Sequence, residues 1–322
     1  MMGPMTTEAH APWTLCVGIT PCLQRTLQCE RFSAGDVNRV RSVTVSPGGK
    51  AVNVARALAT LKGHPLVTGF IGGDNGRALI SLLDAMKLEH DFVSSRIPTR
   101  ICTTALDEAS GAVTEFVEEA PPPAEGELGE LTERVSGLLS RCGIVIAAGA
   151  LPPLWPDDTY ARLASAVAAS GLPLIIDTHG APLLSSLASR PVLTKLNHLE
   201  LAETCQCRVT TVEETLSAMR TLVKRGTRWI LVTHGPQSAW LASDTEVWKY
   251  TPPSVSVLNT IGSGDAATAG TAHALRHGLS MPEAARVGMA CGAANSMTLT
   301  PGEIDAAAVD YLLEDVKVER II

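Results

Sequence analysis

Aromatic side chains are scarce in this sequence, and the patterns that mark several large protein classes are missing. Only 4% of its 322 residues are Phe, Trp or Tyr. No apolar run approaches the ~20 residues that a membrane-spanning helix needs. No cluster of Lys and Arg interrupts a formal charge of −7, which disfavours a nucleic-acid or anionic-membrane surface. We therefore expect a soluble protein with neither a nucleic acid nor a membrane as partner.

The eight cysteines form no CxxC pair, and Cys205 and Cys207 have no second Cys or His pair nearby. They are interpreted as small core residues in a reducing compartment. The first residues lack the basic-then-apolar order of a secretory signal. The sequence thus predicts a cytoplasmic location, a disordered lead-in over 1–12 and one α/β domain over 13–318.

Hydrophobic residues make up 45% of the chain, and their spacing alternates between short apolar runs and helical periodicity. Such alternation favours a doubly wound, mostly parallel sheet with helices on both faces. Strands are predicted at 13–19, 66–70, 144–148, 174–177, 193–196 and 229–233. Helices are predicted at 51–62, 76–86, 156–170, 199–204, 212–225 and 266–277.

Two segments, about 23–46 and 96–118, have strand patterns without intervening helices. They are expected to form a small sheet that covers the carboxyl edge of the parallel sheet. Ligands bind at that edge in folds of this class. The sequence therefore predicts a ligand site between the main sheet and a small β-sheet lid.

The segment Asn259-Thr-Ile-Gly-Ser-Gly-Asp265 carries the most chemical information. Gly262 and Gly264 allow a tight turn that presents backbone N–H groups at the start of a helix, where an anion is stabilised. Asp265 lies at the same helix start and can accept a proton from a substrate hydroxyl. Such a pattern is compatible with phosphoryl transfer, in which Asp265 would be the base and the turn Gly262, Ser263 and Gly264 the anion hole.

Three other interpretations of these loops were weighed. Asp265 alone could be a helix cap. A dinucleotide fingerprint would need an acid after a second strand, whereas Glu283 begins another helix. A P-loop fails because Thr44 and Ala51 stand where that motif needs Gly and Ser or Thr.

With its motifs in order from Trp13 to Leu313, the chain resembles the ribokinase-like, or phosphofructokinase-B type, carbohydrate kinases. Within that family it is most similar to the branch of 1-phosphofructokinase and tagatose-6-phosphate kinase. The resemblance implies a three-layer α/β core, a β-sheet lid that often joins two subunits, and Mg-ATP as phosphoryl donor. A monovalent cation is left open as a further requirement.

The resemblance assigns roles residue by residue. Ser46-Pro-Gly-Gly-Lys50, Thr99-Arg100, Lys195-Leu-Asn-His-Leu-Glu200, Thr233-His-Gly235 and Thr260–Asp265 match the family's motifs. It implies that Asn197 and Glu200 organise Mg²⁺, with water in between. The residues implied to bind the sugar phosphate are Gln24, Arg39, Gly48, Gly49, Lys50, Asn53 and Arg100. Those implied to bind the nucleotide are Lys195, Asn197, Glu200, Thr233, Gly235, Thr260 and Asn295.

One departure bears on the substrate. Thr20-Pro-Cys-Leu-Gln-Arg-Thr26 resembles a family motif in which aspartate stands at the position of Gln24. An amide both donates and accepts hydrogen bonds but carries no charge, so sugar recognition is expected to differ here. Asp177 and His179 show no catalytic pattern and are interpreted as structural or supporting residues.

The expected reaction is ATP-dependent phosphorylation of a hexose phosphate, with fructose 1-phosphate giving fructose 1,6-bisphosphate. The alternatives are a tagatose-6-phosphate or fructose-6-phosphate kinase, and a catalytically silent sugar-phosphate sensor. Lys50, Arg39 and Arg100 favour a phosphorylated over an unphosphorylated sugar. A homodimer joined through the lid is expected from the resemblance.

Overall fold

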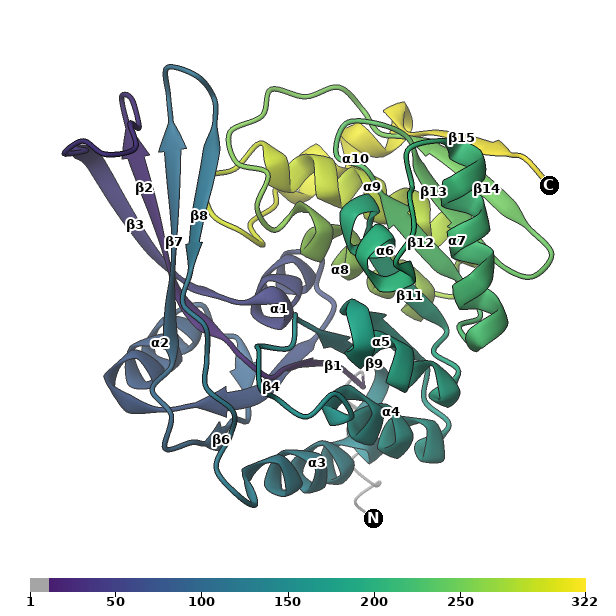
Figure 1. Cartoon of the computed structure of the whole chain (residues 1–322), viewed down its shortest axis with the longest axis horizontal. Coiled ribbons are helices and arrows are strands. Elements are labelled where there is room, and N and C mark those ends of the chain that lie inside the picture. Colours follow the sequence, from purple (N-terminus) through teal and green to yellow (C-terminus); the bar gives the residue numbers. More distant parts are fainter. Residues whose placement is uncertain (1–11) are drawn as a thin grey trace, which may run out of the picture.

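The computed structural model describes residues 12–322, so the expected lead-in lies outside the described residues apart from Pro12. Eleven strands of the described chain form the main sheet, in the order β15-β14-β13-β12-β11-β10-β9-β1-β4-β5, with β6 also paired to β4 (Figure 1). The strands are β1 Trp13–Gly18, β4 Pro65–Ile71, β5 Glu89–His90, β6 Val93–Ser94, β9 Cys142–Ala148, β10 Leu174–Asp177, β11 Leu193–Asn197, β12 Ile230–Thr233, β13 Ala239–Ala242, β14 Val247–Thr251 and β15 Lys317–Arg320.

The central strands pair in parallel and the strands beyond β12 pair antiparallel. β1, β9 and β10 are almost entirely buried, as expected for parallel strands covered on both faces. Because the parallel strands share one direction, their carboxyl ends meet at one edge of the sheet. Gly18, Ala148, Asn197 and Thr233 end four of these strands, and all four residues line the same cleft.

Helices cover both faces of the main sheet, each with its own hydrophobic core. One face carries α1 Lys50–Thr60, α2 Gly73–Ala85, α8 Ser263–Arg276, α9 Met281–Ser296 and α10 Ala306–Asp315. The other carries α3 Glu127–Leu138, α4 Thr159–Ser170, α5 Gly180–Ser186, α6 His198–Cys205 and α7 Val212–Arg225, with the short 3-10 turns Leu139–Arg141 and Leu187–Ser189.

Local signals explain where several helices begin. Thr211 and Glu214 form a capping box at α7, and Ser280 and Glu283 form one at α9. The helix at Glu283 is the one that the sequence predicted. Glu283 lies in the first turn of a helix and not at the end of a strand, so the dinucleotide-binding interpretation has no structural basis.

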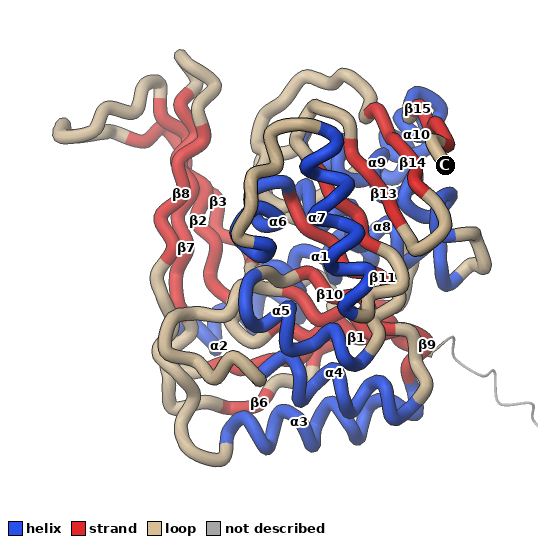
Figure 2. The backbone as a smooth tube through the Cα atoms, turned by 45° about the vertical axis from the view of Figure 1, so that its right-hand side comes forward, coloured by secondary structure: helices blue, strands red, loops and turns tan. Residues whose placement is uncertain are grey.

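A second sheet of four strands stands beside the main body (Figure 2). Its order is β3-β2-β7-β8, with β2 Cys22–Cys29, β3 Val40–Gly48, β7 Arg100–Asp107 and β8 Val113–Val117. We call it the small sheet, and the side that lines the cleft its inner face. The predicted α/β fold, a mostly parallel doubly wound sheet with a separate small sheet, is confirmed. The sequence did not predict α3, α10 or the antiparallel strands β13, β14 and β15.

Candidate active site

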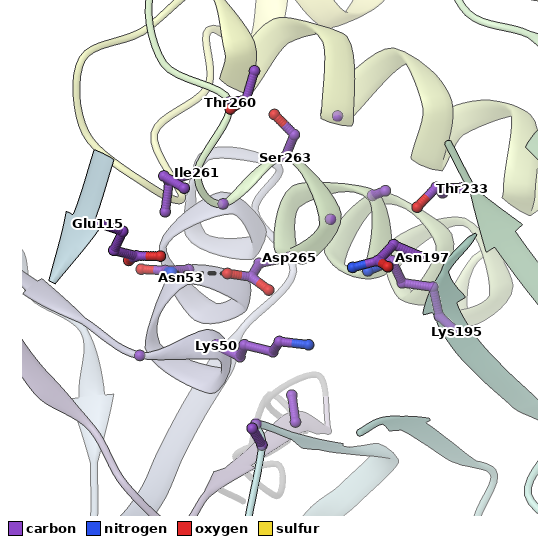
Figure 3. Close-up of a pocket in the computed structure, with 18 of the residues that line it drawn as sticks. Lys50, Asn53, Glu115, Lys195, Asn197, Thr233, Thr260, Ile261, Ser263 and Asp265 are labelled. Atoms are coloured by element: carbon purple, nitrogen blue, oxygen red, sulfur yellow. Dashed lines mark hydrogen bonds between the residues drawn. The ribbon is translucent and has the colours of Figure 1, made fainter. Parts of the chain in front are cut away.

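A cleft of about 1070 Å³ separates the small sheet from the carboxyl edge of the main sheet. Its walls come from the parallel strand ends, the start of α8 and the inner face of the small sheet (Figure 3). Fifteen predicted site residues line it: Gln24, Gly49, Lys50, Asn53, Arg100, Lys195, Asn197, Glu200, Thr233, Gly235, Thr260, Gly262, Ser263, Gly264 and Asp265. Segments far apart in the sequence thus meet at one edge of the fold.

Two glycines permit the turn that begins α8. Gly262 caps the helix with a φ of 84°, and a Cβ there would lie 2.8 Å from atoms of Pro301 and Gly302. A Cβ on Gly264 would lie 2.5 Å from Nζ of Lys195. The Lys195 ammonium therefore packs directly against the helix start. Its charge adds to that of the first-turn N–H groups, so this corner of the cleft favours an anion.

Asp265 is buried in the first turn of α8, where its Oδ2 accepts a 2.8 Å hydrogen bond from Nδ2 of Asn53. Burial, together with the nearby Asp177 carboxylate, raises the pKa of Asp265 to about 7, against the charges of Lys50 and Lys195. A carboxyl group that titrates near neutral pH can take up a proton during a reaction and release it afterwards. This geometry suits Asp265 to the role of general base.

Asp177, at the end of β10, holds two lysines at the bottom of the cleft. Its carboxylate is fully buried and accepts from Nζ of Lys50 at 2.8 Å, Nζ of Lys195 at 3.1 Å and Oγ1 of Thr268 at 2.9 Å. Burial opposes the charge of Asp177, but the two lysines and these hydrogen bonds lower its pKa well below the usual range. Burial likewise opposes the charge of Lys50, whose pKa Asp177 and Glu200 nevertheless raise.

Comparison with known proteins decides the family. Residues 14–299 match the model of the pfkB family carbohydrate kinases. The chain belongs to this family. It is therefore an ATP-dependent carbohydrate kinase, and the family predicted from the ordered motifs is confirmed.

Individual relatives agree with this assignment. The chain is 30% identical to 1-phosphofructokinase from Bacillus subtilis (strain 168) over 95% of its own length and 99% of that protein. Phosphofructokinase-2 from Escherichia coli, solved in complex with potassium, has a TM-score of 0.86 at 26% identity, over 94% of this chain and 99% of that one. A possible 1-phosphofructokinase from Thermotoga maritima has a TM-score of 0.88 at 22% identity, over 96% and 100%, and shows the fold alone.

In this pfkB kinase, Asn197 and Glu200 form the capping box of α6. Oδ1 of Asn197 accepts from the N–H groups of Leu199 and Glu200, and Oε2 of Glu200 accepts from the Asn197 N–H at 2.8 Å. Oε1 of Glu200 accepts from Lys50 at 3.0 Å. Burial works against the charge of Glu200, but Lys50 lowers its pKa, so it remains a carboxylate. Asn197 and Glu200 can therefore cap α6 and still take the role in organising Mg²⁺ that the resemblance implies.

The same residues can be tested for their fit to Mg²⁺. No group of three or more His, Cys, Asp or Glu able to hold a metal occurs in residues 12–322. Mg²⁺ commonly keeps several waters and binds through one or two carboxylates together with substrate phosphates. Glu200 offers one such carboxylate on the cleft wall. The site therefore fits a water-mediated Mg²⁺ and not a dedicated protein cage.

Arg100 and Gln24 face the cleft from the small sheet. The Arg100 guanidinium donates to the backbone oxygens of Glu118 at 3.0 Å and Thr20 at 3.3 Å. Its buried Nε has no hydrogen-bond partner within residues 12–322, and the Arg100 side chain lines the cleft. The side chain of Gln24 is almost fully buried, and its Nε2 donates to Oγ1 of Thr104 at 2.8 Å.

Three predicted residues do not line the cleft. Gly48 packs beneath Gln24, where a Cβ would lie 2.8 Å from the Cβ of Gln24. Asn295 braces the turn before α8: its Nδ2 donates to the Ile261 carbonyl and its Oδ1 accepts from the Gly302 N–H. Arg39 is exposed in the connection between β2 and β3, at the far tip of the small sheet.

The structure also brings to the site residues for which the sequence gave no catalytic role. Asp177 was interpreted as a supporting residue, and its two lysine contacts show what it supports. His179 and Glu115 line the cleft as well. The ring of His179 lies 3.7 Å from carboxylates of both Glu200 and Glu203. Only strand pairing and chain crossover bring these side chains to the cleft, so no local motif could have identified them.

Among the described helices, none is both long and apolar enough to cross a membrane.

Proposed function

We propose that this kinase transfers the γ-phosphoryl group of ATP to a hydroxyl of a hexose phosphate, converting fructose 1-phosphate to fructose 1,6-bisphosphate. One observation carries the proposal: a buried carboxylate, Asp265, lies in the first turn of α8 in a cleft that the Arg100 side chain also lines. The 30% identity to a 1-phosphofructokinase over nearly the whole chain supports this substrate.

Each residue has a defined part in the proposed reaction. Asp265 takes the proton from the attacking hydroxyl as its oxygen bonds to the γ-phosphorus and the bond to ADP breaks. The first-turn N–H groups of α8 and the adjacent Lys195 ammonium stabilise charge on the phosphoryl oxygens in transit. Asn53 holds Asp265 in position. Arg100 binds the phosphate that the sugar already carries.

The nucleotide is assigned to the part of the cleft lined by Asn197, Thr233, Gly235 and Thr260. Mg²⁺ would be held through water by Glu200 and Asn197, and when bound it would neutralise charge on the ATP phosphates. Lys50 forms ion pairs with Asp177 and Glu200, so its proposed contact with the sugar phosphate requires it to exchange one of these partners. Asn295 contributes by bracing the anion-hole turn. A monovalent cation remains a proposal, supported by the relative solved with potassium.

The two alternatives expected from the sequence differ in their support. A fructose-6-phosphate or tagatose-6-phosphate kinase is supported by the likeness to Escherichia coli phosphofructokinase-2, which was also solved with fructose-6-phosphate. A silent sugar-phosphate sensor would need an incompetent base, which the position and pKa of Asp265 disfavour. A cytoplasmic location is supported by ATP as the donor and by the eight cysteines, all of which are free thiols.

The test is ADP release from ATP with fructose 1-phosphate, fructose 6-phosphate, tagatose 6-phosphate and unphosphorylated fructose, with the product's position of phosphorylation read by NMR. We expect the highest kcat/KM with fructose 1-phosphate. A higher kcat/KM with a 6-phosphate would reassign the substrate. Binding of sugar phosphates without ADP release would establish the sensor.

A homodimer through the small sheet is also proposed. The outer face of this sheet exposes Val43, Val45 and Phe116 by 42%, 48% and 54% of their surface, and apolar patches of this kind often mark interfaces. A relative, phosphofructokinase-2, has a tetrameric inhibited form. Sedimentation of Val45→Asp against wild type tests the proposal: a monomeric variant from a dimeric wild type is expected, and unchanged assembly would contradict it.

A further inference from the structure

Glu115 occupies a prominent position on the inner face of the small sheet. Its Cα is paired with that of Thr104 on β7, and Thr104 is paired with Thr26 on β2. Directly paired residues project their side chains to the same face of a sheet, and so do residues two apart along a strand. Glu115 therefore shares one face with Gln24, and both residues line the cleft.

The two side chains differ in what they offer a ligand. Gln24 is almost fully buried, and its amide nitrogen is engaged by the Thr104 hydroxyl. Residue 24 therefore contributes no charge to the cleft, whereas the family motif that Thr20–Thr26 resembles has an aspartate at this position. Glu115 is exposed and lines the cleft, and in Figure 3 its carboxylate points toward Asn53, the residue that holds Asp265.

Hydrogen-bond acceptors predominate at this point of the cleft. Asn53 directs its Nδ2 to Asp265, and its buried Oδ1 has no hydrogen-bond partner within the described chain. Asp265 is itself an acceptor when ionised. Among the residues of β2, β3, β7 and β8 that line this cleft, Glu115 is the one with a carboxylate. Neighbouring acceptors of this kind fit a ligand that presents several hydroxyl donors.

We propose that Glu115 accepts a hydrogen bond from a sugar hydroxyl and determines specificity, placing on β8 the carboxylate that position 24 lacks on β2. This rests on the proposed function, because it takes the bound ligand to be a sugar phosphate. The electrostatics of the site support it. Although Glu115 is exposed to the cleft, the walls around it partly remove water and so raise its pKa, against the charge of Arg100; a hydroxyl donor from a ligand would stabilise the carboxylate.

The test compares KM for the sugar phosphate and for ATP in wild type and Glu115→Gln. Loss of a charged hydrogen bond should raise the sugar-phosphate KM about 10–100-fold. The KM for ATP should not change. Simple charge removal predicts the opposite sign, since losing a carboxylate favours an anionic substrate. The matched control is Glu119→Gln, which removes the same charge from the cleft lining beyond the end of β8.

A double variant sharpens the test. Gln24→Asp combined with Glu115→Gln returns the carboxylate to β2 and should recover part of the lost affinity. The proposal is overturned if Glu115→Gln leaves the sugar-phosphate KM unchanged or lowers it, or if Glu119→Gln raises it equally. A wild type that phosphorylates no sugar phosphate would instead overturn the proposed function. Near-ultraviolet circular dichroism of each variant separates these outcomes from misfolding.

Discussion

The two walls of the cleft are built on different physical principles. The floor, formed by Lys50, Asp177, Lys195 and Asp265, holds the buried Asp177 in ion pairs with Lys50 at 2.8 Å and Lys195 at 3.1 Å, and Asp265 is buried there as well. The small sheet opposite contributes Arg100 and Glu115 to the cleft lining, where Glu115 is exposed. Asp177 is paired with Lys195 and Thr268 before any ligand arrives, whereas Glu115 has hydrogen-bonding capacity left over.

This difference matches a division between chemistry and recognition. Phosphoryl transfer is accelerated mainly by fixed charges and positioning, and a buried network supplies both without rearrangement during the reaction. Recognition of a particular sugar needs polar groups that are satisfied only when the ligand is present. Substitutions in the floor should therefore reduce kcat or stability, and substitutions in the small sheet should raise the KM for the sugar.

The largest effect is expected at the base. Asp265→Asn preserves the shape of the side chain but removes proton acceptance, so kcat should fall about 10²–10⁴-fold. ATP affinity, measured by titration calorimetry, should stay unchanged because the change adds no bulk. Near wild-type turnover would mean that Asp265 is not the base and that the floor does not carry the chemistry.

The next largest effect is expected on stability. Lys195→Met leaves the buried Asp177 with Lys50 as its remaining cationic partner, and breaking a buried ion pair costs about 3–5 kcal/mol. Urea unfolding at neutral pH measures the loss. Lys195 also holds down the pKa of Asp265, so the acid limb of the pH–rate profile should move to higher pH. The control is Lys249→Met, which removes a surface ion pair with Glu319 and should have little effect.

On the other wall, Arg100→Ala should change recognition alone. Removing a charged hydrogen bond should raise the sugar-phosphate KM about 10–100-fold. The KM for ATP and the free energy of unfolding should change much less. Equal losses for both substrates would show that Arg100 supports the cleft as a whole, and the contrast between the two walls would fail at this residue.

The smallest effect is a gradual one with pH, in which kcat/KM and the free energy of unfolding change in opposite directions. Below pH 7, protonation of Asp265 should lower kcat/KM, by about tenfold per pH unit well below the pKa. Stability should run the other way. The folded pKa lies above the unfolded value, so the native state holds a proton that the unfolded state loses, and this contribution disappears as pH rises toward 7. Asp265→Asn should flatten both profiles, as pH–rate data and unfolding at several pH values would show.

How much of this the sequence predicted depends on how far apart the cooperating residues are. The helices at 199–204 and 212–225 and the turn at Gly262 were predictable because caps, periodicity and glycine act over a few residues. The antiparallel edge β13–β15 was missed because its short strands carry no strong alternation and are ordered by pairing with β12. The predicted role of Arg39 in binding the sugar phosphate stays a prediction, because Arg39 does not line the cleft.

The sequence by itself predicted the fold class, the glycine turn at the start of α8 and Asp265 as the candidate base, because each is encoded in segments whose geometry follows from local sterics and hydrogen bonding. Only the tertiary structure decided that Asp177 would hold two lysines, 127 and 18 residues away along the chain, and that Gln24 would donate to Thr104, 80 residues away. It also decided that Glu115 would lie on the same wall as Gln24. Such partners are set by strand register and chain crossover, and the pKa of Asp265 follows from them because burial and neighbouring charge exist only in the folded chain.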